Sequence, residues 1–198
     1  DLLNHRGFRA QWSDTDVLPL ANEHWLDSLV DTEAAAPLLK ARLEAESQVM
    51  VLPGFYGRNA RGEIQLLGRN GTDYSAAATA AAIGAGLCQI WKDVDGFFTA
   101  DPRIVSNARC LDEVSYDEAM ELTYFGAKVI SAKALAPLAA NNIPCEVRNT
   151  YDPSRPGTRV HKDAQRTHVV RGISHLQDVS SITLQGGGLR GRVGIASR

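Results

Sequence analysis

The 198-residue sequence predicts an α/β fold, in which a doubly wound, mostly parallel sheet carries helices on both faces. Two observations support this prediction. Short apolar runs alternate with longer segments of helical composition from residue 7 to residue 149, and such alternation is typical of parallel strands joined by crossover helices. The run LCQIW, at residues 87–91, is apolar over most of its length, as expected for a strand covered on both faces.

The N-terminal part predicts one α/β unit followed by a hairpin. Residues 7–12 form a short strand, and residues 32–48 form a helix with apolar positions on one face. Residues 49–55 are apolar and end in a Pro-Gly break, which indicates a buried strand. Residues 56–68 then surround an Asn-Ala-Arg-Gly turn at residues 59–62, the pattern of a β-hairpin.

The middle of the sequence continues the alternation of helices and strands. Gly84 and Gly86 end a helix that begins at Thr72. Ser115 and Glu118 have the spacing of a capping box, which predicts a helix N-terminus at Ser115. The remaining predicted elements are a strand at residues 87–91, a loop at 92–103, helices at 115–126 and 127–142, and a strand at 144–149.

The sequence divides near residue 160. Residues 150–160 contain two prolines and a glycine among charged side chains, which predicts a linker or the close of a domain. Residues 161–198 then give two strand-like pieces, a glycine cluster and a helix start. We expect one domain over residues 1–160 and an incomplete second one over residues 161–198. The first residue is Asp1 rather than methionine, so we expect a fragment of a longer protein.

Composition and charge exclude several classes of protein. A formal net charge of −2 argues against a nucleic-acid-binding surface, which would be basic, and no apolar run is long enough to cross a membrane. The three cysteines are odd in number and far apart, so we expect reduced, buried thiols in a cytoplasmic protein. The five histidines are scattered without ligand spacing, and we predict no metal site built from side chains.

The segment LGRNGTDYSAA is the first candidate for chemistry. Gly68 and Gly71 allow a ligand to approach the backbone, and the Arg69 guanidinium can hold a carboxylate or phosphate through two hydrogen bonds. Thr72 and Asp73 open the following helix, whose free N–H groups and dipole favour an anion. The alternative is a simple turn in which Thr72 or Asp73 is only an N-cap, and the segment alone leaves both interpretations open.

The loop at residues 92–103 is the second candidate. Its acidic residues, its arginine and its two phenylalanines follow a strand end and suit a nucleotide with its metal ion. The alternative is structural, because Asp-Gly and Asp-Pro are ordinary turn sequences. Lys128 is the third candidate, since a lysine at the start of the 127–142 helix is disfavoured by the helix dipole unless an anion lies nearby. A solvated lysine is the alternative there.

In combination and in this order, the segments LGRNGTDYSAA, IWKDVDGFFTADPR, MELTYFGAKV and NTYDPSRPGT resemble the C-terminal half of the aspartokinase catalytic domain. The resemblance implies the amino-acid-kinase fold and transfer of the γ-phosphoryl group of ATP, with Mg²⁺, to the side-chain carboxylate of L-aspartate. This reaction belongs to lysine, threonine and methionine biosynthesis. Residues 172–198 are similar to the start of an ACT regulatory module, which implies an allosteric effector, lysine or threonine, and a homo-oligomer. Two sequence details, the asparagine of Gly-Arg-Asn-Gly and the segment ELTYFGAKV, most resemble bifunctional aspartokinases, which are fused to a second enzyme.

The resemblance also implies roles for individual residues. Asp73 would organise the phosphoryl-transfer centre, and Lys128 would stabilise charge on the transferring group. The residues implied for substrate binding are Phe55, Arg69, Asn70, Gly71 and Thr72. The residues implied for ATP binding are Lys92, Asp93, Phe98, Arg103, Lys128 and Val129.

The sequence departs from the family pattern at several places. The family's Lys-Phe-Gly-Gly phosphate loop and Ser-x-Gly-Glu segment do not occur in residues 1–198, so we expect this polypeptide alone to be inactive. Lys92 stands where a threonine is common, Phe98 stands where a tyrosine is common, and KVISAKA lacks the usual His-Pro. Two alternative functions follow: another enzyme of the same fold, acting on glutamate, acetylglutamate or a nucleotide, or a regulatory or assembly fragment that binds an effector amino acid.

Overall fold

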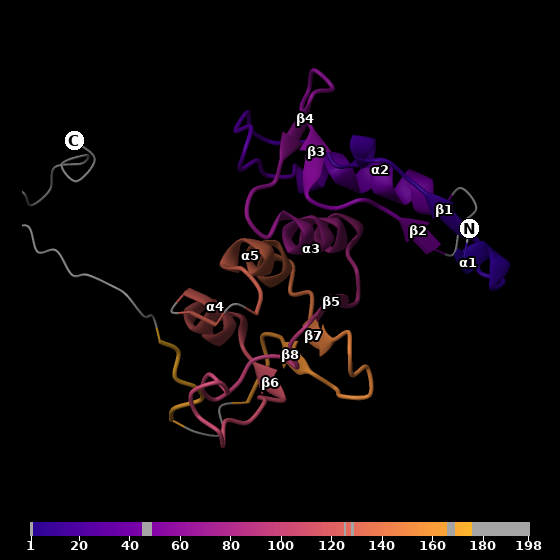
Figure 1. Ribbon diagram of the computed structural model, residues 1–198. Coiled ribbons are helices and arrows are strands. Elements are labelled where there is room, and N and C mark those ends of the chain that lie inside the picture. The colour runs from indigo at the N-terminus through magenta and orange to yellow at the C-terminus, as the bar shows by residue number, and fades with distance from the viewer. Residues whose placement is uncertain (1, 45–48, 125, 128, 166–168, 176–198) are drawn as a thin grey trace, which may run out of the picture.

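The computed structural model describes residues 2–44, 49–124, 126–127, 129–165 and 169–175 (Figure 1). The helices are α1 (Leu2–His5), α2 (Thr32–Glu44), α3 (Gly71–Ile83), α4 (Tyr116–Tyr124) and α5 (Ala132–Ala140), with one 3₁₀ turn at Thr15–Val17. The strands are β1 (Ala10–Trp12), β2 (Val49–Val51), β3 (Tyr56–Arg58), β4 (Ile64–Leu66), β5 (Cys88–Lys92), β6 (Glu113–Val114), β7 (Cys145–Asn149) and β8 (Thr158–Val160).

These strands form three groups. β1 pairs in parallel with β2, and β3 pairs with β4 as an antiparallel hairpin. The four remaining strands form a mixed sheet in the order β5-β7-β8-β6, with β5 parallel to β7 and β6 parallel to β8. Because β5 and β7 are parallel and in register from Cys88↔Cys145 to Lys92↔Asn149, their carboxyl ends meet at one edge of the sheet.

Helix α3 is central to the packing. It lies between α2 and α5 and also contacts β5 (Figure 1). Its small side chains permit this close approach, since Ala77 and Ala78 are completely buried. The largest apolar side chains that are fully buried in the core are Leu18, Leu39, Leu67, Phe97, Leu135 and Leu138.

The structure confirms the α/β fold and several local predictions. The hairpin turns at Asn59, whose carbonyl oxygen accepts a hydrogen bond of 2.9 Å from the Gly62 N–H. The capping box is present, because the Glu118 N–H donates to Ser115 Oγ (3.2 Å) and the Ser115 N–H donates to a Glu118 carboxylate oxygen (2.9 Å). All three cysteines are free thiols, and two of them, Cys88 and Cys145, are buried as expected.

The second predicted helix of the 115–142 region is wrong at its N-terminus. It begins at Ala132, not at residue 127, because Ser131 is extended (φ −80°, ψ 150°) and caps it. Ser131 Oγ accepts a hydrogen bond of 3.2 Å from the Ala134 N–H. The dipole argument for Lys128 therefore fails, since that residue precedes the helix by four positions. Lys128 itself lies outside the described residues.

Residues 150–160, predicted as a linker or the close of a domain, end in β8, which pairs with β7 and β6, so this segment is part of the sheet. One further expectation differs from the structure. β5 is covered on one face only by the described residues: Cys88 and Ile90 are buried, whereas Trp91 is 43% exposed. Residues 176–198, most of the predicted ACT segment, lie outside the described part of the chain. None of the described helices combines the length and apolarity that a membrane span requires.

Candidate active site

The turn before α3 has a backbone conformation that leaves the helix N-terminus without a side-chain cap. Gly68 (φ 80°) and Asn70 (φ 59°) are both left-handed, and the Gly71 N–H donates to the Gly68 carbonyl oxygen at 3.0 Å. Asn70 is the N-cap residue, but its side chain makes no capping hydrogen bond. Neither Thr72 nor Asp73 is the N-cap, so the structure decides against that interpretation. A free helix N-terminus of this kind favours an anion.

Arg69 lies at the outer side of this turn. Its side chain is exposed, and it makes no hydrogen bond or ion pair with any residue that the structure describes. Thr72 and Asn70 are exposed beside it, and Gly71 is buried. The guanidinium is therefore available for a carboxylate or phosphate ligand.

Phe55 and Gly54 pack against the first turn of α3. Phe55 has a positive φ of 80° and its carbonyl oxygen accepts a hydrogen bond of 2.9 Å from the Leu67 N–H. A Cβ atom at Gly71 would lie 3.0 Å from the Phe55 ring, and one at Gly54 would lie 2.9 Å from Ser75 Oγ. Glycine at both positions lets the loop after β2 reach the turn, so Phe55 adjoins the Arg69 turn.

Asp73 and Lys92 meet in an ion pair between α3 and β5. Lys92 Nζ lies 2.8 Å from Asp73 Oδ2, and the two side chains are only 22% and 16% exposed. Asp73 is in the first turn of α3, and Lys92 is the last residue of β5. Two residues 19 positions apart, predicted for different parts of the reaction, are therefore in direct contact.

The carboxyl end of β7 contributes residues that the sequence analysis did not assign to the site. Asn149 Nδ2 donates to Asp95 Oδ1 at 2.7 Å, and Arg155 Nη1 donates to Asp95 Oδ2 at 2.7 Å. The Thr150 N–H donates to the Lys92 carbonyl oxygen at 2.7 Å. This network fixes the loop after β7 beside Lys92. The sequence signal that could have found it is the place of Asn149 at the carboxyl end of a strand, where ligands of open α/β sheets bind.

The remaining nucleotide candidates are spread along the loop after β5. Asp93 is exposed directly after the strand, and Phe98 is half-buried and forms an isolated β-bridge with Cys110. Arg103 is 87% exposed and pairs with Asp101 through its Nη2 atom at 2.6 Å. The Arg103 guanidinium lowers the pKa of the Asp101 carboxyl to about 2. The structure thus brings together Phe55, Arg69–Thr72, Asp73 and Lys92, but it holds Arg103 on Asp101.

Val129, the last predicted nucleotide contact, is buried with Ile130 at the end of the segment that precedes α5. Val129 is only 8% exposed, so its side chain is part of the core. The predicted catalytic Lys128 next to it lies outside the described residues.

Within the described residues, no group of three or more His, Cys, Asp or Glu side chains could hold a metal ion. Mg²⁺ needs less from a protein, because it is commonly held by one or two carboxylates together with substrate phosphates and water. Asp73 and Asp93, which flank the carboxyl end of β5, suit that role by their chemistry and place.

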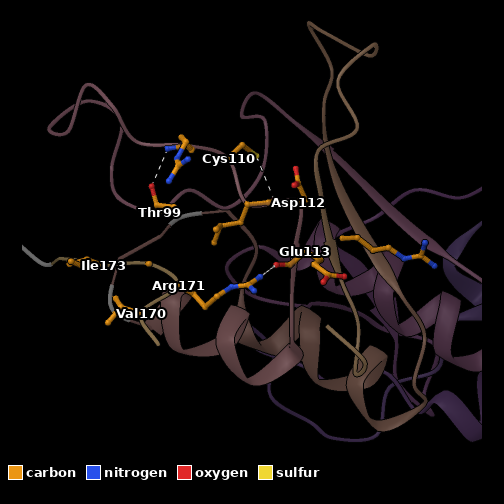
Figure 2. Close-up of a pocket in the computed structure, with 11 residues that line it drawn as sticks. Thr99, Cys110, Asp112, Glu113, Val170, Arg171 and Ile173 are labelled. Atoms are coloured by element: carbon orange, nitrogen blue, oxygen red, sulfur yellow. Dashed lines mark hydrogen bonds between the residues drawn. The ribbon is translucent and has the colours of Figure 1, made fainter. Parts of the chain in front are cut away.

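A cavity of about 610 Å³ lies in a different part of the molecule. Figure 2 shows it between Thr99, Cys110 and Asp112 on one side and Val170, Arg171 and Ile173 on the other. Arg171 donates a hydrogen bond to the Glu113 carbonyl oxygen across its floor. Its lining includes none of the residues predicted for substrate or nucleotide.

The described residues thus combine an α/β fold with an uncapped turn before α3 and an ion pair at the carboxyl end of β5. The chain belongs to the amino acid kinase family, whose sequence profile matches residues 2–149. Its relatives in that family include aspartokinases. It is 44% identical over 194 residues to the bifunctional aspartokinase/homoserine dehydrogenase of Haemophilus influenzae. This match covers 98% of this chain and 24% of the Haemophilus protein.

Solved structures agree with this assignment. Escherichia coli aspartokinase III in complex with aspartate and ADP (R-state) superposes with a TM-score of 0.79 at 35% identity, covering 86% of this chain and 39% of that one. The same enzyme in complex with lysine and aspartate (T-state) gives a TM-score of 0.73 at 37% identity, covering 83% of this chain and 37% of that one. The chain therefore spans only a quarter to two fifths of the length of these relatives.

Proposed function

We propose that the protein is an aspartate kinase, which transfers the γ-phosphoryl group of ATP to the β-carboxylate of L-aspartate and releases ADP. The Asp73–Lys92 ion pair beside the uncapped turn of Arg69 is the observation that carries this proposal. It combines a fixed charge pair at a strand end with a free guanidinium and a helix N-terminus, and phosphoryl transfer requires positioning and positive charge above all.

On the substrate side, Arg69 would hold the aspartate carboxylate through two hydrogen bonds. The backbone of Asn70, Gly71 and Thr72 would donate to the same substrate, and Phe55 would bound the site. Support comes from the exposure of Arg69 and from the left-handed Asn70, whose side chain leaves the helix N-terminus uncapped.

On the nucleotide side, Asp73 would organise the transfer centre, and Lys92 and Asp93 would lie against the ATP phosphates. Lys128 would stabilise charge on the transferring group, with Val129 beside it. Phe98 would adjoin the base, and Arg103 would exchange Asp101 for a phosphate. Mg²⁺, bound to the nucleotide with Asp73 or Asp93, would neutralise charge on the β- and γ-phosphates.

The wider context is part of the same proposal. We expect the reaction to serve lysine, threonine and methionine biosynthesis, with lysine or threonine as an effector at the ACT segment and with a homo-oligomeric assembly. A cytoplasmic location suits the three free thiols, which stay reduced there.

A coupled assay of ADP release tests the proposal on the full-length natural protein that contains this chain. We expect turnover that depends on L-aspartate and Mg²⁺ and that exceeds turnover with glutamate, acetylglutamate or UMP. Faster turnover with one of those three compounds would mean that this compound, and not aspartate, is the substrate. No turnover with any of the four compounds would favour a regulatory fragment. Residues 1–198 alone should show no aspartate-dependent turnover, because they lack the family's phosphate loop.

A further inference from the structure

We propose that Lys133, on α5, is a positioning residue that fixes the substrate turn Gly68–Gly71 through the residue that precedes it, Leu67. This inference rests on the proposed function, because the turn it positions is the one assigned to aspartate. It concerns a residue that lies outside the predicted catalytic and binding set.

The ammonium group of Lys133 has three acceptors around it. Nζ lies 2.5 Å from Asp27 Oδ1, and it donates to the carbonyl oxygens of Leu67 at 2.7 Å and of Ser28 at 3.1 Å. A lysine ammonium carries three N–H donors, so all of them are used. Lys133 is therefore not free to bind a substrate anion, and it acts through the groups that it holds.

The Tyr74 ring provides a further contact. Lys133 Nζ lies 4.8 Å from the ring centroid, within cation–π range. The Tyr74 hydroxyl oxygen in turn accepts a hydrogen bond of 3.0 Å from the Val30 N–H. One side chain, only 22% exposed, thus joins α5, the 27–30 segment, the residue before the turn and the first turns of α3.

These contacts bear directly on the geometry of the turn. Leu67, whose carbonyl oxygen Lys133 holds, immediately precedes Gly68, and its N–H is fixed on the Phe55 carbonyl oxygen at 2.9 Å. A Cβ atom at Gly68 would lie only 2.4 Å from Asp27 Oδ1, so the turn passes tightly over the same ion pair. Without Lys133, the carbonyl oxygens of Leu67 and Ser28 would lose their shared donor, and the direction of Arg69 would be less defined.

Steady-state kinetics of the full-length protein carrying Lys133→Met test the inference. We expect the KM for aspartate to rise at least about tenfold, because displacing a positioned group by an ångström can cost about a hundredfold in rate. The KM for ATP should change by less than about twofold, since no nucleotide group is displaced. Lys40→Met, at an exposed position of α2, is the matched control and should leave both values unchanged.

Asp27→Asn is a milder second variant, because the Asp27 side chain is 74% exposed and its loss leaves both carbonyl contacts. It should raise the KM for aspartate about threefold, in keeping with a surface ion pair. An unchanged aspartate KM in both variants, or an equal rise in the KM values of both substrates, would overturn the inference.

Amide hydrogen exchange separates this inference from the proposed function. In Lys133→Met, the Leu67 and Gly71 amides should exchange at least about tenfold faster, whereas the amides of β7 should not change. Unchanged exchange at the turn would contradict the inference even in an active kinase. Faster exchange there in a protein that does not use aspartate would instead reject the proposed substrate and keep Lys133 as the residue that fixes the turn.

Discussion

At the scale of single residues, the site depends on backbone conformations that side chains do not reveal. Asn70 occupies the left-handed region at φ 59°, and its side chain does not cap α3. The common function of asparagine at a helix start is to cap it, so the residue type alone favours the opposite interpretation. The absence of that cap is what leaves the first turn of α3 free for a ligand.

Replacing Arg69 by alanine in the full-length protein should impair aspartate use specifically. The lost contact is charge-assisted and bidentate, so we expect a loss of transition-state stabilisation on the order of 2–4 kcal/mol. This corresponds to a fall in kcat/KM for aspartate of roughly 30- to 700-fold. Initial rates over a range of aspartate concentrations measure this effect. Arg9→Ala, at an exposed position far from the turn in sequence, is the control. Unchanged kinetics in Arg69→Ala would mean that this arginine is only a turn residue.

At the scale of elements, helix boundaries decide which residues can act together. α5 begins at Ala132 because Ser131 caps it. This boundary separates Lys133, which is in the first turn of α5, from Lys128, which precedes the helix. The sequence pattern predicted a continuous helix from residue 127, since the run is rich in alanine and leucine and a helix start by a single serine is a weak local signal.

Ser131→Ala should destabilise the protein by about 1 kcal/mol, the usual cost of losing an N-cap hydroxyl. Urea unfolding followed by circular dichroism measures the free energy of unfolding. Ser106→Ala, in an exposed turn, is the matched control and should change it by less than about 0.5 kcal/mol. A cap that contributed nothing would give the two variants the same unfolding midpoint.

At the scale of the whole molecule, α3 lies at the centre of the described packing, where it contacts α2, α5, β3 and β5. Its alanine surface packs against α2 on one side and α5 on the other (Figure 1). Leu135 and Leu138 of α5 are completely buried in the core. The positions of Asp73, at the start of α3, and Lys133, in α5, therefore depend on the same packing.

Leu135→Ala should lower the free energy of unfolding by about 2–5 kcal/mol, because it leaves a cavity among tightly packed side chains. Leu38→Ala in α2 is the control, since Leu38 is 43% exposed, and it should cost less than about 1 kcal/mol. Thermal or urea unfolding of both variants gives the comparison. Equal losses would show that Leu135 contributes no more to the core than the exposed Leu38.

The sequence by itself determined the α/β class, the hairpin, the helix after the Gly-Arg-Asn-Gly turn and the segments that carry the candidate site. These features depend on local periodicity, on turn residues and on motif spacing, all of which act over a few neighbouring residues. Only the tertiary structure decided that Asp73 contacts Lys92, that β8 completes the sheet and that Lys133 reaches the Leu67 carbonyl oxygen. Each of these contacts joins residues that are distant in the chain. Their pairing is fixed by how the helices pack on the strands, which no local pattern encodes.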